Sequence, residues 1–187
     1  MDKKLLFIVN PRAGRTKSFA PLFDAVACFS KAGYLVKVFL TEGRGDATRA
    51  AAELGGAYDL VVCAGGDGTF NEMVSGLMQL DHPPVLRYIP FGSTNDCATT
   101  LRLPRDPVKA AQTASETGVP RPWDIGRLNG RPFVYVAAFG AFTEVSYDTP
   151  QDLKNTFGHL AYVMAGIASL PSITCLLYTS PSPRDRS

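Results

Sequence analysis

Four short apolar runs, each followed directly by a polar or glycine-rich segment, constrain the fold of this chain more than any other feature. The runs lie at residues 5–9, 35–40, 60–64 and 85–89. The first and third are apolar throughout, which is typical of strands buried on both faces of a parallel sheet. Segments with helical spacing separate the runs. We therefore predict an α/β fold in which helices cover both faces of a doubly wound, mostly parallel sheet.

The helices predicted between and after these strands follow from apolar spacing and from capping residues. Asp46 is expected to cap an alanine-rich helix that two glycines close. The predicted helices cover 22–33, 46–54, 70–77, a short segment from near Asn95, and 107–116.

The pattern changes near residue 121. Segments 123–128 and 133–137 resemble strands and flank Asn129-Gly130, a strong signal for a hairpin turn. We expect a first domain over 1–122 and a β-rich region over 123–175, with a helix at about 154–170. Residues 176–187 have no periodicity and are expected to form a disordered tail. The tail is either a native flexible terminus or, as its resemblance to adapter-derived sequence favours, a non-native addition.

Composition excludes several classes of protein. The 187 residues include 19 Lys and Arg against 17 Asp and Glu, a net charge of +2 that argues against nucleic-acid binding. The four cysteines form no CxxC pair and are expected to be free, buried thiols in a reducing compartment. The apolar stretch 160–170 is too short to cross a bilayer, so we expect a soluble, cytoplasmic protein.

Four segments carry the candidate chemistry, and each begins where a predicted strand ends. They lie at 10–14, 41–46, 65–72 and 91–96. In doubly wound sheets, ligands bind at the edge formed by the carboxyl ends of the strands. Four polar or glycine-rich segments at one such edge therefore predict a binding site.

The segment 65–72, Gly-Gly-Asp-Gly-Thr-Phe-Asn-Glu, is the most informative of the four. Its glycines let a ligand approach the backbone, and N–H groups at a helix start bind phosphate. Asp67 would repel phosphate unless a cation, water or basic group intervenes, which favours a metal-assisted or hydrogen-bond-organising role. The alternative is a tight glycine turn with Asp67 as a helix cap.

Several nucleotide-binding families are excluded. No Gly-Lys pair occurs, so a P-loop is absent, and Asn71 stands where the dinucleotide fingerprint needs its third glycine. The protein-kinase motifs are also absent. A nucleotide-binding protein outside these families is favoured.

Three motifs, 10–14, 65–72 and Gly-Ser-Thr-Asn-Asp-Cys-Ala at 92–98, together resemble the diacylglycerol kinase catalytic domain family. This family includes soluble bacterial diacylglycerol kinases, sphingosine kinases and ceramide kinases. The Gly-Gly-Asp-Gly-Thr segment is shared with NAD kinases, so an NAD kinase-like enzyme stays an alternative. A non-catalytic nucleotide-binding or regulatory module is a third possibility.

The resemblance implies that ATP binds at the carboxyl edge and that its γ-phosphate passes to a lipid hydroxyl. Asp67, Asp96 and Asp124 match positions that form an acidic network with water and Mg²⁺ near the phosphates in bacterial members. The implied nucleotide contacts are Asn10, Pro11, Arg12, Ala13, Gly14, Thr41, Gly66, Asp67, Gly68, Thr69, Phe70, Asn71, Glu72, Ser93 and Thr94.

The resemblance also implies a β-sandwich second domain that binds the lipid and supplies the general base and a structural magnesium site. After Gly126 this chain carries no second acidic glycine motif. We therefore expect residues 123–175 to be an incomplete second domain, and the chain to be a truncated, inactive fragment that binds nucleotide only. The full-length enzyme is expected to be cytoplasmic, to contact a membrane surface transiently, and to allow a homodimer.

Overall fold

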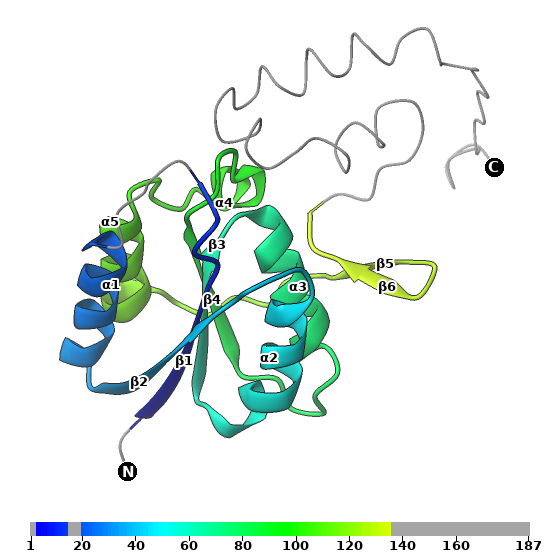
Figure 1. The fold of residues 1–187 in the computed structure, drawn as a ribbon, viewed down its shortest axis with the longest axis horizontal. Coiled ribbons are helices and arrows are strands. Elements are labelled where there is room, and N and C mark those ends of the chain that lie inside the picture. The colour runs from blue at the N-terminus through cyan, green and yellow to red at the C-terminus, as the bar shows by residue number, and fades with distance from the viewer. Residues whose placement is uncertain (1–2, 15–19, 136–187) are drawn as a thin grey trace, which may run out of the picture. The chain divides into compact units, whose positions relative to one another are not determined.

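A four-stranded parallel sheet forms the centre of the domain (Figure 1). The computed structural model describes residues 3–14 and 20–135. The strands are β1 (Lys3–Val9), β2 (Tyr34–Leu40), β3 (Leu60–Gly65) and β4 (Val85–Pro90), in the order β2-β1-β3-β4. Every neighbouring pair is parallel. The predicted fold class is confirmed.

Helices cover both faces of the sheet (Figure 1). On one face lie α1 (Ala20–Lys31) and α5 (Pro107–Gln112), which continues into a π-helical turn, Thr113–Thr117. On the other lie α2 (Asp46–Leu54), extended by a 3₁₀ turn at Gly55–Ala57, and α3 (Asp67–Leu77). The short helix α4 (Asp96–Thr100) follows β4. The carboxyl ends of all four strands therefore share one edge.

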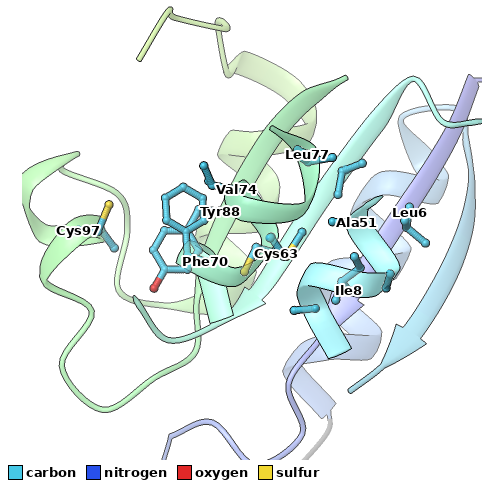
Figure 2. Close-up of a cluster of buried hydrophobic side chains, with 14 residues drawn as sticks. Leu6, Ile8, Ala51, Cys63, Phe70, Val74, Leu77, Tyr88 and Cys97 are labelled. Carbon is cyan, nitrogen blue, oxygen red and sulfur yellow. The ribbon is translucent and has the colours of Figure 1, made fainter. Parts of the chain in front are cut away.

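Alternate residues of the central strands build a separate core on each face. Leu6 and Ile8 of β1 pack toward α2 and α3, whereas Leu5 and Phe7 pack toward α1 and α5. Figure 2 shows the first core, in which the rings of Phe70 and Tyr88 stack with centroids 4.4 Å apart. Because residues 5–9 of β1 and all of β3 are buried on both faces, these stretches contain no charged residue, whereas Lys3 and Lys4 at the start of β1 are exposed.

Gly76 allows α2 and α3 to pack closely on this face. A Cβ atom at Gly76 would lie 2.3 Å from the carbonyl oxygen of Thr48 and 2.8 Å from the Cβ of Ala51. This close contact fixes the position of α3 against α2. The first residue of α3 is Asp67.

A short antiparallel hairpin follows, formed by β5 (Gly126–Leu128) and β6 (Arg131–Phe133). Asn129 and Gly130 both have positive φ, 50° and 77°, as a tight two-residue turn requires. The predicted hairpin and its turn are confirmed, but the first strand is shorter than the predicted 123–128, and the second lies at Arg131–Phe133 and not at 133–137. The chain divides into two compact units, Met1–Ala137 and Ala138–Ser187, and all described residues belong to the first. The boundary at 122 stays a prediction.

Several predicted features lie outside the described residues: the helix at 154–170, the tail at 176–187, and Cys175. Cys28, Cys63 and Cys97 are free thiols, as predicted; Cys63 and Cys97 are also buried, whereas Cys28 is only partly buried. In the part of the chain that the structure describes, no helix is long and apolar enough to cross a membrane.

Candidate nucleotide site at the carboxyl edge

Asn10, directly after β1, connects its loop to the start of α3. Its side-chain Nδ2 donates a hydrogen bond to Thr69 Oγ1 at 3.0 Å, and its Oδ1 accepts one from the backbone N–H of Arg12. At Gly14, φ is +77° and an added Cβ would lie 2.2 Å from the Phe91 carbonyl oxygen. The loop after β1 therefore contacts the segments that follow both β3 and β4.

The segments after β3 and β4 approach each other backbone to backbone. The N–H of Phe91 donates to the carbonyl of Gly65 at 2.8 Å. A Cβ at Gly92 would lie 2.5 Å from the Cα of Gly66, so this approach needs glycine. Three of the four predicted loops thus converge on the first turn of α3.

Asp67 joins α3 to α4. Its two carboxylate oxygens accept hydrogen bonds from the backbone N–H groups of Asp96, at 2.9 Å, and Cys97, at 3.1 Å. The alternative in which Asp67 caps its own helix is wrong, because Gly66 is the N-cap and these bonds go to a different helix. Burial raises the pKa of the Asp67 carboxyl, while the two N–H donors oppose that rise.

A cleft of about 160 Å³ opens beside Asp67. Asp67 and Asp96 both line it, so the structure brings together two of the three predicted carboxylates. Asp124 is exposed in the segment before β5 and is not among the residues that line the cleft. The three-carboxylate network stays a prediction. The lining residues are Asp67, Phe70, Asn71, Asp96, Cys97, Val134 and Tyr135.

Cys97 lines this cleft but is not a reactive thiol. Burial, followed by the charge of Asp67, raises its pKa to about 11. Burial also raises the pKa of Cys63 well above its usual range. Thiols protonated at neutral pH are poor nucleophiles, so neither cysteine is a candidate for covalent chemistry.

Other predicted nucleotide contacts divide into exposed and buried residues. Arg12, Gly68, Ser93 and Thr94 are exposed, whereas Ala13, Thr41, Thr69 and Phe70 are buried. Pro11, Gly14, Gly66 and Glu72 are partly exposed. Buried members shape the loops, and exposed members are available to a ligand.

Asn71 has a contact that the sequence did not predict. Its Oδ1 accepts a hydrogen bond from the backbone N–H of Val134 at 3.1 Å. The Asn71 amide therefore holds the segment after the hairpin against α3.

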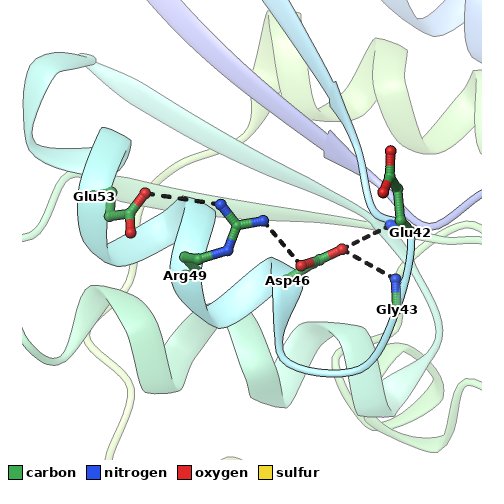
Figure 3. A network of polar contacts seen from close by, with 5 residues as sticks. All are labelled: Glu42, Gly43, Asp46, Arg49 and Glu53. Atoms are coloured by element: carbon green, nitrogen blue, oxygen red, sulfur yellow. Dashed lines mark hydrogen bonds and ion pairs between the residues drawn. The ribbon is translucent and has the colours of Figure 1, made fainter.

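The loop after β2 is organised by Asp46. Its Oδ2 accepts hydrogen bonds from the N–H groups of Glu42 and Gly43, and its Oδ1 contacts Arg49 at 3.0 Å (Figure 3). The prediction that Asp46 caps α2 is wrong: the cap is Gly45, whose φ of 88° suits glycine, and Asp46 is the first helical residue. The side chain therefore closes the preceding loop.

We expect Asp46→Ala to lower the melting temperature at pH 7, and we expect this loss to shrink as the pH falls below 3.8. The hydrogen bond from Arg49 and the two backbone donors lower the pKa of Asp46 below its usual 3.8. Such a group stabilises the fold above its unfolded-state pKa, and the stabilisation is lost as the pH falls through the folded-state value. Thermal melts of both proteins across this range measure the difference, and a difference independent of pH would contradict the prediction.

Sequence reasoning missed Asn95 as a site residue. It lies inside the predicted segment 91–96 and has left-handed backbone geometry, with φ 55° and ψ 52°. Asparagine is one of the few residues that adopt this conformation readily, which was a usable signal. Val134, by contrast, reaches the cleft only through tertiary folding and gave no signal.

The site fits magnesium held largely through water. Mg²⁺ is commonly bound by one or two carboxylates together with waters and substrate phosphates. Asp67 and Asp96 supply two carboxylates to one cleft. Across residues 3–14 and 20–135, no group of three or more His, Cys, Asp or Glu side chains could hold a metal ion by itself.

The fold and the site define a doubly wound α/β domain whose glycine-rich loops meet at the carboxyl edge around a helix start. The family model described as the diacylglycerol kinase catalytic domain matches residues 4–128. A diacylglycerol kinase of Bacillus subtilis is 43% identical over 172 residues, covering 91% of this chain and 57% of that protein. One of Staphylococcus epidermidis is 40% identical over 174 residues, covering 92% and 55%.

A solved structure agrees with the sequence comparison. The crystal structure of a diacylglycerol kinase from Bacillus anthracis superposes with a TM-score of 0.65 at 34% identity, over 71% of this chain and 48% of that one. The chain belongs to the diacylglycerol kinase catalytic domain family, as the motifs predicted. It spans a little over half the length of the relatives it matches.

Proposed function

We propose that this domain binds ATP at its carboxyl edge and serves a lipid kinase that transfers the γ-phosphate to a lipid hydroxyl. One observation carries the proposal most: Asp67, inside a glycine-rich helix start, is held by the backbone of a second helix beside an open cleft. Phosphoryl transfer depends on positioning and on charge neutralisation. The fixed loops and helix start support positioning, and a cation held at Asp67 would supply the neutralisation.

The first turn of α3 is the proposed phosphate site. The opening N–H groups of a helix have no acceptor within the helix and carry its positive dipole end. A Cβ at Gly68 would meet nothing within 4 Å, so the approach to this turn is open. Asn10, Thr41, Ser93 and Thr94 are proposed to contact the rest of the nucleotide from neighbouring loops.

Asp67 and Asp96 are the residues that would hold Mg²⁺, through waters, with Asp124 as the predicted third member. When bound, the ion would neutralise charge on the phosphates. The domain's own contribution is to fix Asp67, since the backbone donors of α4 leave its carboxylate few other orientations.

Transfer to the lipid is proposed to need the part of the relatives that this chain does not match, including a general base. The chain itself is then expected to bind nucleotide without phosphorylating an acceptor. Because the acceptor is a lipid, the proposal includes transient contact with a membrane surface. A cytoplasmic location and a homodimer stay predictions.

Calorimetric titration with ATP and Mg²⁺ tests the proposal, and Gly68→Ala sharpens it. The variant should not lower the melting temperature, because its methyl group meets no atom and alanine favours a helix, but it should bind ATP more weakly by about tenfold at the phosphate site. Gly43→Ala is the matched control, since Gly43 is also unobstructed and lacks positive φ.

Three results would count against the proposal. No ATP binding by the wild-type chain would reject it. Equal ATP affinity in the Gly68 and Gly43 variants would show that the phosphates do not bind at the first turn of α3. Titration with NAD⁺ tests the alternative in which NAD⁺, and not a lipid, accepts the phosphate, because tight NAD⁺ binding would favour an NAD kinase-like enzyme.

A further inference from the structure

Asn95 precedes α4 but does not cap it in the usual way. An asparagine at this position ordinarily accepts a hydrogen bond from an N–H group in the first turn of its own helix. Here the side chain makes no such bond, and the backbone is left-handed, with φ 55° and ψ 52°. The first N–H groups of α4 are therefore left for another acceptor.

The Asn95 side chain instead turns back into the preceding loop. Its Oδ1 accepts from the N–H of Gly92 at 2.9 Å, and its Nδ2 donates to the carbonyl of Gly92 at 2.7 Å. The same Oδ1 lies 3.3 Å from the hydroxyl of Tyr88, whose ring stacks on Phe70 in the core. The turn from Gly92 to Asn95 is thus tied to itself and to β4.

This turn decides where α4 begins. Because Asn95 reverses the backbone, the N–H groups of Asp96 and Cys97 face the Asp67 carboxylate at 2.9 and 3.1 Å. On the other side, Gly92 is in backbone contact with Gly66, the residue before Asp67. Asn95 therefore lies between two contacts with the start of α3: the Gly92–Gly66 backbone contact and the hydrogen bonds that the next two residues donate to Asp67.

We infer that Asn95 is a positioning residue, which holds the start of α4 so that its two backbone donors orient the Asp67 carboxylate. Its importance for nucleotide binding rests on the proposed function. Its effect on the Asp67 contact does not, and the two can be measured separately.

Asn95→Gly is the decisive variant, because glycine keeps the left-handed backbone but removes every side-chain bond. Asn129→Gly is the matched control: Asn129 is an exposed asparagine with φ 50° in the β5–β6 turn. Amide hydrogen exchange of Asp96 and Cys97, followed by NMR in the whole chain, reports the contact without nucleotide. We expect faster exchange at both amides in Asn95→Gly and wild-type exchange in Asn129→Gly. Unchanged exchange in Asn95→Gly would overturn the inference.

Mg-ATP titration, performed well below each melting temperature, gives the second readout. Asn95→Gly should change affinity by about tenfold, and this change should vanish when Asp67 is already asparagine. An equal change in both backgrounds would show that Asn95 does not act through Asp67 and would overturn its positioning role. If the wild-type chain binds no ATP, the proposed function fails, while the exchange data still decide the Asn95 contact.

Discussion

Replacing Asp67 with asparagine is expected to reduce phosphoryl transfer at least ~100-fold while the fold stays intact. Asparagine has the same shape, but its amide nitrogen cannot accept a hydrogen bond, so one of the bonds from Asp96 and Cys97 is lost. The negative charge that would organise Mg²⁺ and water beside the phosphates is lost as well. Because the carboxyl is half-buried, the neutral side chain avoids a desolvation cost, which limits the effect on stability.

The measurement needs an active enzyme, such as a chimera in which the Bacillus subtilis relative supplies the part that this chain does not match. Turnover on dispersed diacylglycerol would be compared with that of Asp59→Asn. Asp59 also accepts a backbone N–H bond, from Lys4 at 2.7 Å, but lies before β3, away from the site. Normal turnover in Asp67→Asn, or an equal loss in both variants, would reject a mechanistic role for Asp67.

Gly76→Ala is expected to destabilise the domain by about 2 kcal/mol. Alanine is the better helix former by roughly 1 kcal/mol, so helix propensity alone would predict that the variant is more stable than wild type. Sterics decide the outcome, because the new methyl group would lie 2.3 Å from the Thr48 carbonyl oxygen in α2. That atom belongs to a helix backbone and cannot rotate away, so α3 must move as a unit.

Urea unfolding measures this loss, with Gly56→Ala as the control. A Cβ at Gly56 would make only ordinary contacts with Leu80, at 3.8 and 3.9 Å, so its stability should stay within about 0.5 kcal/mol of wild type. Because α3 carries Asp67, Gly76→Ala should also weaken nucleotide binding in the folded state. A stabilised Gly76→Ala protein would show that the α2–α3 contact is looser than the structure indicates.

The sequence was sufficient for the fold because the two central strands must be apolar on both faces. Residues 5–9 and 60–64 therefore identified the sheet, and the segments after them marked the carboxyl edge at which the binding site is proposed. The Asn129-Gly130 turn was equally clear, because positive φ at both positions restricts the choice of residues.

The contacts of Asp67 and Asp46 could not be predicted in the same way. Both carboxylates looked like caps because both stand at helix starts. Asp67 instead accepts from residues 29 and 30 positions later in the chain, and Asp46 accepts from residues before it. Local patterns place a carboxylate at a helix start, but only the packing of α4 against α3 decides which N–H groups it meets.

The unequal connections among the four loops have an evolutionary consequence. Asn10 contacts Thr69, Gly14 contacts Phe91, and Gly66 contacts Gly92, so a change in one of these three loops must be accommodated by the others. The loop after β2 is instead closed by its own Asp46. In homologues, the loops after β1, β3 and β4 should therefore vary together, whereas the loop at 42–46 should vary independently. We expect ligand selectivity to diverge most easily in the loop at 42–46.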